Sequence, residues 1–554
     1  MSDRRWLWVA AAGFGAVLLG SCGPKDKGDG PGKDPEDSGT NPYPDCPPGS
    51  VVTWENFAQG YIDTWCTGCH STLLTGDARN DAPVGVDFDT YEMTVAQEDG
   101  LWIFATGDEP LMPPTGGTTA EERALFQEWL DCGLPGEGGT VGDCDVSTPV
   151  PGDAVVQSQA DADALCAAGN QVGGALELAG GDVSMDCLCA IDGDLRLVGG
   201  SLDAPLLASV GGALTAEGGT VTTLTAPALV DVGGLVLDGS AFETLSLPEL
   251  DRVAGDLVIT GNSGLQTLDL PRLRTVGGTL DVSGNPVLTD FGLIRLDAVG
   301  GDLLLVDDPS LADLVATEAV ETIGGDLVVS GNHGISSVDV FLTLTSVGGR
   351  IEVSDNGGLT ELEGFTLMAS VGGEVRISGN PALEAVAVFD TLETATGDLV
   401  FVDNPALVDL LGFSNLTAVD GTVRIEGCGG VMNLVGFDAV TRMGGFQYVD
   451  NDQALGLFGL DALTEVTGDL ELSGNGALMF LGELDAVTTV GGSLVVADNA
   501  ALPGVIELHS IDTVGADLTV TDNPMLPTSA ANALVTAIGA GDIGGTVTIA
   551  GNAP

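Results

Sequence analysis

From about residue 166 onward, the chain repeats one short unit, and this periodicity restricts the possible fold more than any other feature of the sequence. Examples are "VAGDLVITGNSGLQTLDLPRLRT", "VGGTLDVSGNPVLTDFGLIRLDA" and "VGGEVRISGNPALEAVAVFDTLET". Aligned on their glycine pair, seventeen such units follow one another, mostly 19 to 24 residues apart, with a last step of 29 residues. A long array of short units at a nearly constant period predicts a solenoid, in which each turn buries its apolar residues against the turns beside it.

Two kinds of solenoid fit a unit of this length. A leucine-rich horseshoe needs room for a helix on its outer face, whereas segments such as "LQTLDLPRLRTVGG" contain Pro, Thr and Val in alternation and suit short strands. We therefore predict a mainly β protein whose residues 166–554 form a parallel β-helix of about 17 turns. At a strand spacing of about 4.8 Å, such a rod is roughly 80 Å long. The repeats resemble the receptor L-domain repeats of growth-factor receptors and fungal wall proteins, which implies a β-solenoid.

One asparagine recurs at the same place in most units, after two turn residues, and Asp308 and Cys428 take this place in two exceptional units. Stacked asparagines predict a structural ladder, because their amides can hydrogen-bond between turns and cap the turn backbone. Replacing Asn404, which is next to Cys428 in this stack, is expected to cost less stability than replacing Asn380. The asparagines of the ladder are Asn262, Asn285, Asn332, Asn356, Asn380, Asn404, Asn451, Asn475, Asn499, Asn523 and Asn552.

Acidic residues dominate the surface chemistry of the chain. Its 81 acidic and 16 basic side chains give a net charge of −65, which excludes nucleic acid as a partner and suits a basic partner or divalent cations. A row of aspartates recurs in the repeats, and a solvated acidic row is the simplest interpretation, with calcium bound along it as the alternative. These aspartates are Asp256, Asp302, Asp326, Asp398, Asp469 and Asp517.

We expect the rod not to be an enzyme. Polysaccharide lyases built on parallel β-helices need clustered Lys or Arg for acidic glycans, and the chain has no Lys after Lys33. Glycan hydrolases need paired carboxylates in one cleft, whereas the aspartates here stand at regular repeat positions. Before the last unit, "PTSAANALVTAIGAGD" predicts a short helix with Ser529 as its N-cap, which would shield the open end of the coil.

The front of the chain has a different composition and carries one motif with clear chemistry, Cys66-Thr-Gly-Cys69-His70. Two thiols at this spacing can add to the vinyl groups of a haem, and the adjacent histidine can ligate its iron. Met112, in the Pro-rich stretch "EPLMPPTGG", is the candidate for the other axial position, and Met93 is the second choice. A disulfide between the two cysteines and a metal site are the alternative interpretations.

Two predicted helices surround this motif. Aromatic residues in "WENFAQGYIDTW" recur at spacings of three and four, and "TTAEERALFQEWLDCG" follows the methionine loop. With "CTGCH" and "LMPPTGG", these segments resemble the small cytochrome c domains of large-genome Gram-negative bacteria. The resemblance covers about 90 residues and implies covalent haem c on Cys66 and Cys69, with His70 as proximal and Met112 as distal ligand of the haem iron. It also implies electron transfer with a redox partner that the sequence does not identify.

The first residues predict export. Two arginines precede an apolar run of signal-peptide length, and Leu19-Gly20-Ser21-Cys22 resembles the lipobox of bacterial lipoproteins. This resemblance implies cleavage before Cys22 and lipidation of that cysteine, so that the membrane is reached through a lipid anchor. The residue after it, Gly23, favours an outer-membrane lipoprotein, facing the periplasm or the cell surface. The expected layout is a signal peptide (1–22), a tether (23–45), a haem domain (46–140), a linker (141–165) and the solenoid (166–554).

Of the ten cysteines, seven are assigned neither to lipid nor to haem, and this odd number leaves at least one unpaired. Cys46 and Cys132 bracket the front domain and could staple it. The pairing among Cys144, Cys166, Cys187 and Cys189 stays open.

Taken together, the sequence predicts a lipid-anchored envelope c-type cytochrome that carries an acidic solenoid for binding or spacing. The ligand of the solenoid, a protein or a glycan, is not identified. The alternative hypothesis is a cell-surface recognition or adhesion lipoprotein whose front domain is stapled by disulfides and holds no haem.

Overall fold

The computed structural model describes residues 148–554, apart from 313, 315–318, 339, 432 and 433, together with Cys144 and a few positions of the front segment. The chain divides into two compact units, Met1–Gly139 and Thr140–Pro554. The described positions of the first unit are Ala58, Tyr61, Ile62, Cys66, Phe88, Thr94, Leu125, Phe126, Gln127 and Trp129.

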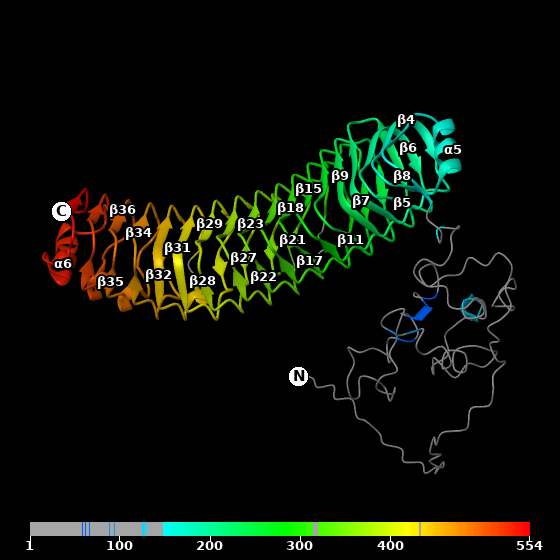
Figure 1. The fold of residues 1–554 in the computed structure, drawn as a ribbon. Helices are drawn as coiled ribbons and strands as arrows, with labels where there is room; N and C mark the ends of the chain where they lie inside the picture. The colour runs from blue at the N-terminus through cyan, green and yellow to red at the C-terminus, as the bar shows by residue number, and fades with distance from the viewer. Residues whose placement is uncertain are drawn as a thin grey trace, which may run out of the picture. The chain divides into compact units, whose positions relative to one another are not determined.

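The second unit is a parallel β-solenoid of about 16 turns, which confirms the predicted fold class. Figure 1 shows its strands stacked along a rod, with helix α5 (Gln159–Ala168) at one end and helix α6 (Thr528–Ile538) at the other. Each strand pairs in parallel with the equivalent strand one turn away, so backbone hydrogen bonds run along the rod. Among the described helices, none has the length and apolar character needed to cross a membrane.

The first row of strands comes from the alternating segment after the glycine pair. Its inward residues are leucine, valine or isoleucine, with Phe401 as an exception in β29, and its outward residues are variable, as the alternation of strand side chains requires. The row consists of β12 (Leu257–Thr260), β15 (Leu280–Ser283), β18 (Leu303–Val306), β20 (Leu327–Ser330), β23 (Ile351–Ser354), β26 (Val375–Ser378), β29 (Leu399–Val402), β34 (Leu470–Ser473), β36 (Leu494–Ala497), β38 (Leu518–Thr521) and β39 (Val547–Ala550).

A second row lies just before the glycine pair, and both rows belong to one 32-stranded sheet. Its members are β11 (Arg252–Val253), β14 (Thr275–Val276), β17 (Ala298–Val299), β19 (Thr322–Ile323), β22 (Ser346–Val347), β25 (Ser370–Val371), β28 (Thr394–Ala395), β33 (Glu465–Val466), β35 (Thr489–Val490) and β37 (Thr513–Val514). In two turns the rows merge into single bent strands, β31 (Ala418–Glu426) and β32 (Arg442–Val449).

A third row follows the ladder position and forms two small parallel sheets. They are β10 (Thr244–Ser246), β13 (Thr267–Asp269) and β16 (Asp290–Gly292), and then β21 (Ser337–Val338), β24 (Glu361–Leu362), β27 (Ala385–Val386) and β30 (Asp409–Leu410). In later turns, 3-10 helices stand in this part of the coil: η4 (Val435–Phe437), η5 (Leu484–Ala486) and η6 (Ile506–Ser510).

The first turns are less regular, and they begin before the repeat becomes visible in the sequence. Strands β1, β2 and helix α5 lie within or across residues 141–165, for which the sequence predicts a linker. Strand β1 pairs with β3 and β2 with β4, so these residues extend the coil toward the N-terminus. The strands are β1 (Pro149–Val150), β2 (Ala154–Val156), β3 (Gln171–Val172), β4 (Leu176–Ser184), β5 (Ala190–Ile191), β6 (Leu195–Asp203), β7 (Ser209–Glu217), β8 (Val221–Thr225) and β9 (Asp231–Asp238).

A single continuous apolar core runs through the coil, because like residues stack on like residues. Leu257 pairs with Leu280, which pairs with Leu303, and all three side chains are fully buried. A one-residue slip would turn this column toward solvent, so the repeat itself fixes the register.

The predicted C-terminal helix is present as α6, which buries Ala531, Leu534 and Ile538 in the core at the end of the coil. The prediction that Ser529 caps it is wrong. The N-cap residue is Pro527 and no side chain caps the helix, because the helix begins two residues earlier than expected. Thr528 instead donates its hydroxyl to the carbonyl oxygen of Ala553 at 2.8 Å, which ties α6 to the last turn.

Candidate functional site

In the front unit, a helical turn leads into the candidate haem motif. The backbone amide of Cys66 donates to the carbonyl oxygen of Ile62 at 2.8 Å, and Tyr61 and Ile62 are helical. The Cys66 side chain is half-buried. The first cysteine of the motif therefore stands at the end of a helical turn, with part of its surface open to a reaction partner.

Aromatic packing joins the two segments for which the sequence predicts helices. The ring of Tyr61 stacks on Phe126, with 4.3 Å between centroids and 15° between planes, and Phe126 lies 5.5 Å from Trp129. All three residues are buried. Leu125, Phe126 and Trp129 are helical, so the helical turn before the motif packs against the second of these segments.

The remaining site residues and cysteines predicted for the front of the chain lie outside the described residues, so their assignments stay predictions. They are Cys22, Cys46, Cys69, His70, Met93, Met112 and Cys132.

Two disulfides resolve the pairing that the sequence left open at the start of the coil. Cys144 pairs with Cys189 and Cys166 with Cys187, with Cα atoms 5.7 and 5.6 Å apart, which is ordinary disulfide spacing. Cys166 belongs to α5, so the second bond fixes this helix to the turn that it covers. Covalent bonds thus hold the first turns, where the asparagine ladder has not yet begun.

The predicted asparagine ladder bonds mainly to backbone, and each side chain reaches back to the preceding turn. Asn380 accepts the backbone amide of Asn356 on Oδ1 at 3.0 Å and donates from Nδ2 to the carbonyl oxygen of Val353 at 2.9 Å. The same pair of bonds recurs along the coil, for example from Asn404 to Asn380 and to Ile377. The ladder side chains are fully buried from Asn262 to Asn523.

This direction corrects one expectation about the ladder. The two ladder bonds of Asn404 satisfy the turn of Asn380, which is intact, and its only bond toward the turn of Cys428 among the described residues is a long one from Nδ2 to Sγ, at 3.9 Å. We therefore expect the loss of stability on replacing Asn404 to be similar to that on replacing Asn380, and not smaller as the sequence alone suggests.

Asp308 is the first irregular member of the ladder. Its Oδ1 accepts the amide of Asn285 at 2.6 Å, whereas its buried Oδ2 has no hydrogen-bond partner among the described residues. In the same slot an asparagine donates from Nδ2 to a carbonyl oxygen three residues before the preceding ladder position. Burial, opposed in part by the bond from Asn285, raises the pKa of Asp308 to about 7.

Cys428 is the second irregular member. Its thiol donates to the carbonyl oxygen of Phe401 at 3.3 Å, in the place of the usual amide donor, and its amide donates to Asn451 Oδ1 at 2.9 Å. The side chain is fully buried, and burial raises the pKa of the thiol to about 11. The thiol is therefore protonated at neutral pH and serves as a weak donor within the ladder.

The row of aspartates, for which the sequence predicts a solvated surface or, as the alternative, bound calcium, forms a second ladder of hydrogen bonds. Asp302 Oδ1 accepts the amide of Asp326 at 2.7 Å, and Asp326 Oδ1 accepts the amide of Arg350 at 2.9 Å. Asp256, Asp398, Asp469 and Asp517 each accept the equivalent amide of the next turn. The regular spacing of these aspartates could have indicated bonding between turns, since it matches one turn of the coil.

The residue before each ladder position has a left-handed backbone, a feature not predicted from the sequence. From Asp307 to Asp498 this position alternates strictly between aspartate and glycine, with φ between 54° and 72°. A Cβ built on Gly379 would lie 2.3 Å from Oδ1 of Asp355, so the carboxylate of one turn covers the glycine of the next. The alternation provides room for the carboxylate and separates like charges by two turns.

Five phenylalanines form a third stack, inside the core. Their rings are fully buried and stacked, with centroids 5.1 to 5.4 Å apart, and four of them have positive φ angles between 47° and 70°. Phenylalanine recurring every 24 residues in five consecutive units was the available signal. The residues are Phe341, Phe365, Phe389, Phe413 and Phe437.

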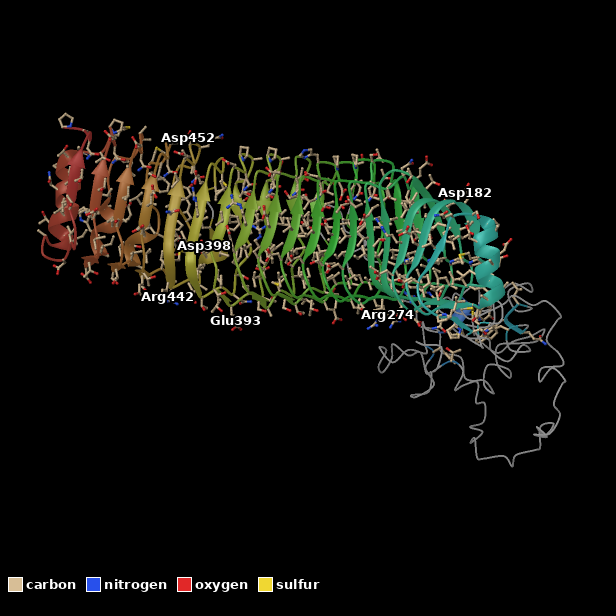
Figure 2. All side chains as sticks on the ribbon, turned by 45° about the horizontal axis from the view of Figure 1, so that its top comes forward. Asp182, Arg274, Glu393, Asp398, Arg442 and Asp452 are labelled. Carbon is tan, nitrogen blue, oxygen red and sulfur yellow. A yellow bond between two sulfur atoms is a disulfide. The ribbon has the colours of Figure 1, made fainter. Side chains whose placement is uncertain are left out.

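Cations on the rod mostly bridge consecutive turns. Arg252 pairs with Asp231 at 3.2 Å and Arg350 with Asp326 at 3.2 Å, in each case one turn earlier. Figure 2 shows Arg274, Glu393 and Arg442 along one long edge of the rod and Asp182 and Asp452 along the opposite edge. With so few cations, most surface carboxylates are not neutralised within the rod.

No metal centre is formed by the described residues: nowhere among them do three His, Cys, Asp or Glu side chains lie close enough together to hold an ion. Comparison with known proteins gives no match, neither to a model of a protein family nor to a curated protein.

Proposed function

We propose that the protein is a lipid-anchored c-type cytochrome of the cell envelope, whose acidic solenoid binds or spaces a partner. One observation carries the proposal: Cys66, the first cysteine of the motif, follows a helical turn that packs, through Tyr61 and Phe126, against the helical residues Leu125, Phe126 and Trp129. A helix before the haem motif and a closing helix packed on it are what the resemblance to small cytochrome c domains implies.

In this proposal the chain holds haem with four residues. Cys66 and Cys69 would form the thioethers, and His70 and Met112 would ligate the iron. The half-buried position of Cys66 at a helix end fits a thiol that must reach a vinyl group. The haem would supply a one-electron couple, and methionine ligation would raise its potential. The buried aromatic residues nearby would exclude water from one side of the group.

Export and anchoring are the second part of the proposal. Two disulfides hold the first turns of the coil, and such bonds persist in oxidising compartments outside the cytoplasm, where covalent haem attachment also takes place. Cys22 would carry the lipid. Cys22→Ser should then release the protein from membranes into the soluble fraction, whereas unchanged membrane association would contradict the anchor.

The experiment that tests the haem proposal is expression in a bacterial host competent for cytochrome c maturation. Haem should remain on the purified protein after acid–acetone extraction, and a Cys66→Ser/Cys69→Ser variant should carry none. If the wild-type protein binds no haem, or if all of its haem extracts, the front unit is no c-type cytochrome. The recognition or adhesion lipoprotein with a disulfide-stapled front domain would then be the better proposal.

A further inference from the structure

An exposed apolar strip runs along five consecutive turns of the solenoid, on the side where the third row of strands gives way to η4, η5 and η6. Its exposed fractions range from 36 % for Phe480 to 68 % for Ile506. Adjacent turns are joined directly there, since Met479 donates its amide to Leu455 and Leu434 donates to Phe458. The strip consists of Val408, Leu411, Val435, Leu455, Phe458, Met479, Phe480 and Ile506.

The aromatic part of the strip is held in place by its surroundings. Phe458 and Phe480 meet edge to face, with 5.5 Å between their centroids. A Cβ built on Gly456 would lie only 2.0 Å from the Phe480 ring, so this glycine makes room for the ring to lie on the turn before it. Contiguous exposed apolar surface that is held in this way marks an interaction site more often than chance exposure does.

Carboxylates border the strip on one side. Asp438, Asp461 and Asp485 stand at equivalent places in three successive turns and are exposed, and Glu483 accepts the amide of Gly459 at 2.6 Å. Partial desolvation, together with the charges of Glu483, Asp438 and Asp485, raises the pKa of Asp461.

The arginines near the strip already form ion pairs. Residues 404–511 contain no lysine and two arginines, Arg424 and Arg442. Arg424 pairs with Glu426 and Arg442 pairs with Asp420, both in the sheet formed by the first two rows. The negatively charged border is therefore complementary to a cationic group of a binding partner.

We propose that the strip and its acidic border form the docking surface for a cationic amphipathic segment of a partner protein. Five turns measure roughly 20 Å, the length of a helix of about 14 residues, whose apolar face would cover Phe458 and Phe480 while its Lys or Arg side chains meet the border. A second copy of this chain is a poor occupant, because each copy has a net charge of −65. Anionic lipid surfaces are repelled for the same reason.

This proposal deepens the binding role proposed for the solenoid, and it is independent of haem. A Cys66→Ser/Cys69→Ser variant of the full chain should bind the same partner as the wild-type protein. Failure of haem attachment and failure of docking are therefore separate results.

The test uses the full chain and, as a probe, a fluorescein-labelled amphipathic helical peptide of leucine and lysine about 14 residues long. Fluorescence anisotropy should show binding that weakens at high salt, with Kd at least tenfold higher for Phe458→Ala/Phe480→Ala and several-fold higher for Asp461→Asn/Asp485→Asn. Ile294→Ala removes an exposed apolar side chain elsewhere on the rod and should leave Kd unchanged. Hydrogen exchange should show protection within residues 404–511.

Several outcomes would overturn the proposal. One is that the peptide does not bind. Another is that both double variants, with unchanged circular dichroism, bind the peptide as tightly as the wild-type protein does, which would indicate attraction to the overall charge alone. A third is that a peptide with glutamate in place of lysine binds equally well. A fourth is that sedimentation shows a dimer that Phe458→Ala/Phe480→Ala dissociates, which would make a second copy the occupant. A fifth is that uncharged lipid vesicles capture the chain through the strip.

Discussion

Oδ1 of Asp308 accepts the backbone amide of Asn285 at 2.6 Å, while the second carboxyl oxygen of Asp308 is buried without a partner among the described residues. Asparagines in this slot donate Nδ2 to a carbonyl oxygen, and the register places the carbonyl oxygen of Val282 there for Asp308. A carboxylate would oppose one acceptor with another. A protonated carboxyl has the shape and the donor of asparagine, so the slot favours the neutral acid.

This relationship predicts that the rod loses stability as pH rises toward neutral. The pKa of Asp308 is about 7 in the folded chain, and its ordinary value is 3.8. Below pH 3.8 Asp308 is protonated in both the folded and the unfolded chain, and its contribution to the free energy of unfolding is fully present. Between these two values only the folded state holds it, so the free energy of unfolding falls by up to about 1.4 kcal/mol per pH unit, and above pH 7 the loss is complete.

Asp308→Asn should remove this dependence, because asparagine supplies the missing donor without a charge. The variant should be more stable than the wild-type protein, by a margin that grows between pH 4.5 and 7 in denaturant unfolding followed by circular dichroism. Asp307→Asn is the matched control, since Asp307 is exposed and adjacent. An equal margin at both pH values would mean that Asp308 is ionised in the folded chain throughout.

Much of the rod could be predicted from the sequence, because one interaction is repeated many times. The glycine pair, the apolar alternation and the asparagine place each recur with every turn, so the coil and the ladder positions follow from their period. The direction of the bonds from Asn380 and Asn404 could not be predicted, since it depends on how the turn aims each side chain along the rod.

Features that depend on two turns at once also escaped prediction. The three-dimensional register is needed to predict that Asp355 covers Gly379 and that Asp326 takes part in amide bonds between turns. It is also needed to predict the disulfide between Cys166 and Cys187. In the front unit, the motif at Cys66 indicates its chemistry by residue type alone.

Alternation of aspartate and glycine before the ladder predicts the effect of Gly379→Ala. Alanine at φ +66° costs about 1–2 kcal/mol, and its Cβ would meet Asp355 Oδ1 at 2.3 Å. Asp355→Gly should recover the steric part of the loss in the double variant, which a double-mutant cycle of unfolding free energies would measure. Additive effects of the two substitutions would mean that the carboxylate moves aside freely.

Met112 is predicted to be the distal ligand of the proposed haem. A methionine–iron bond gives a weak band near the red end of the spectrum of the oxidised protein and raises the reduction potential. Met112→Ala should abolish the band and lower the potential, with covalent haem retained. Met93→Ala is the control and should change neither property. The reverse result would assign the ligand to Met93.

The asparagine ladder makes the last prediction. Asn380→Ala removes the partners of the Asn356 amide and the Val353 carbonyl oxygen, and Asn404→Ala removes those of Asn380 and Ile377. All of these groups lie at the buried ladder corner, so each variant should lose on the order of 1–3 kcal/mol in the free energy of unfolding of the full chain. The two losses should be alike, because both side chains bond to an intact preceding turn.

Asn532→Ala is the control for this comparison, since Asn532 is an exposed residue of α6 outside the ladder and should change stability by less than about 0.5 kcal/mol. A clearly smaller loss for Asn404→Ala would restore the view that the neighbouring Cys428 weakens the ladder in both directions. Negligible losses for both variants would mean that water replaces the amide at this corner, and the recurrence of asparagine would then reflect a turn preference alone.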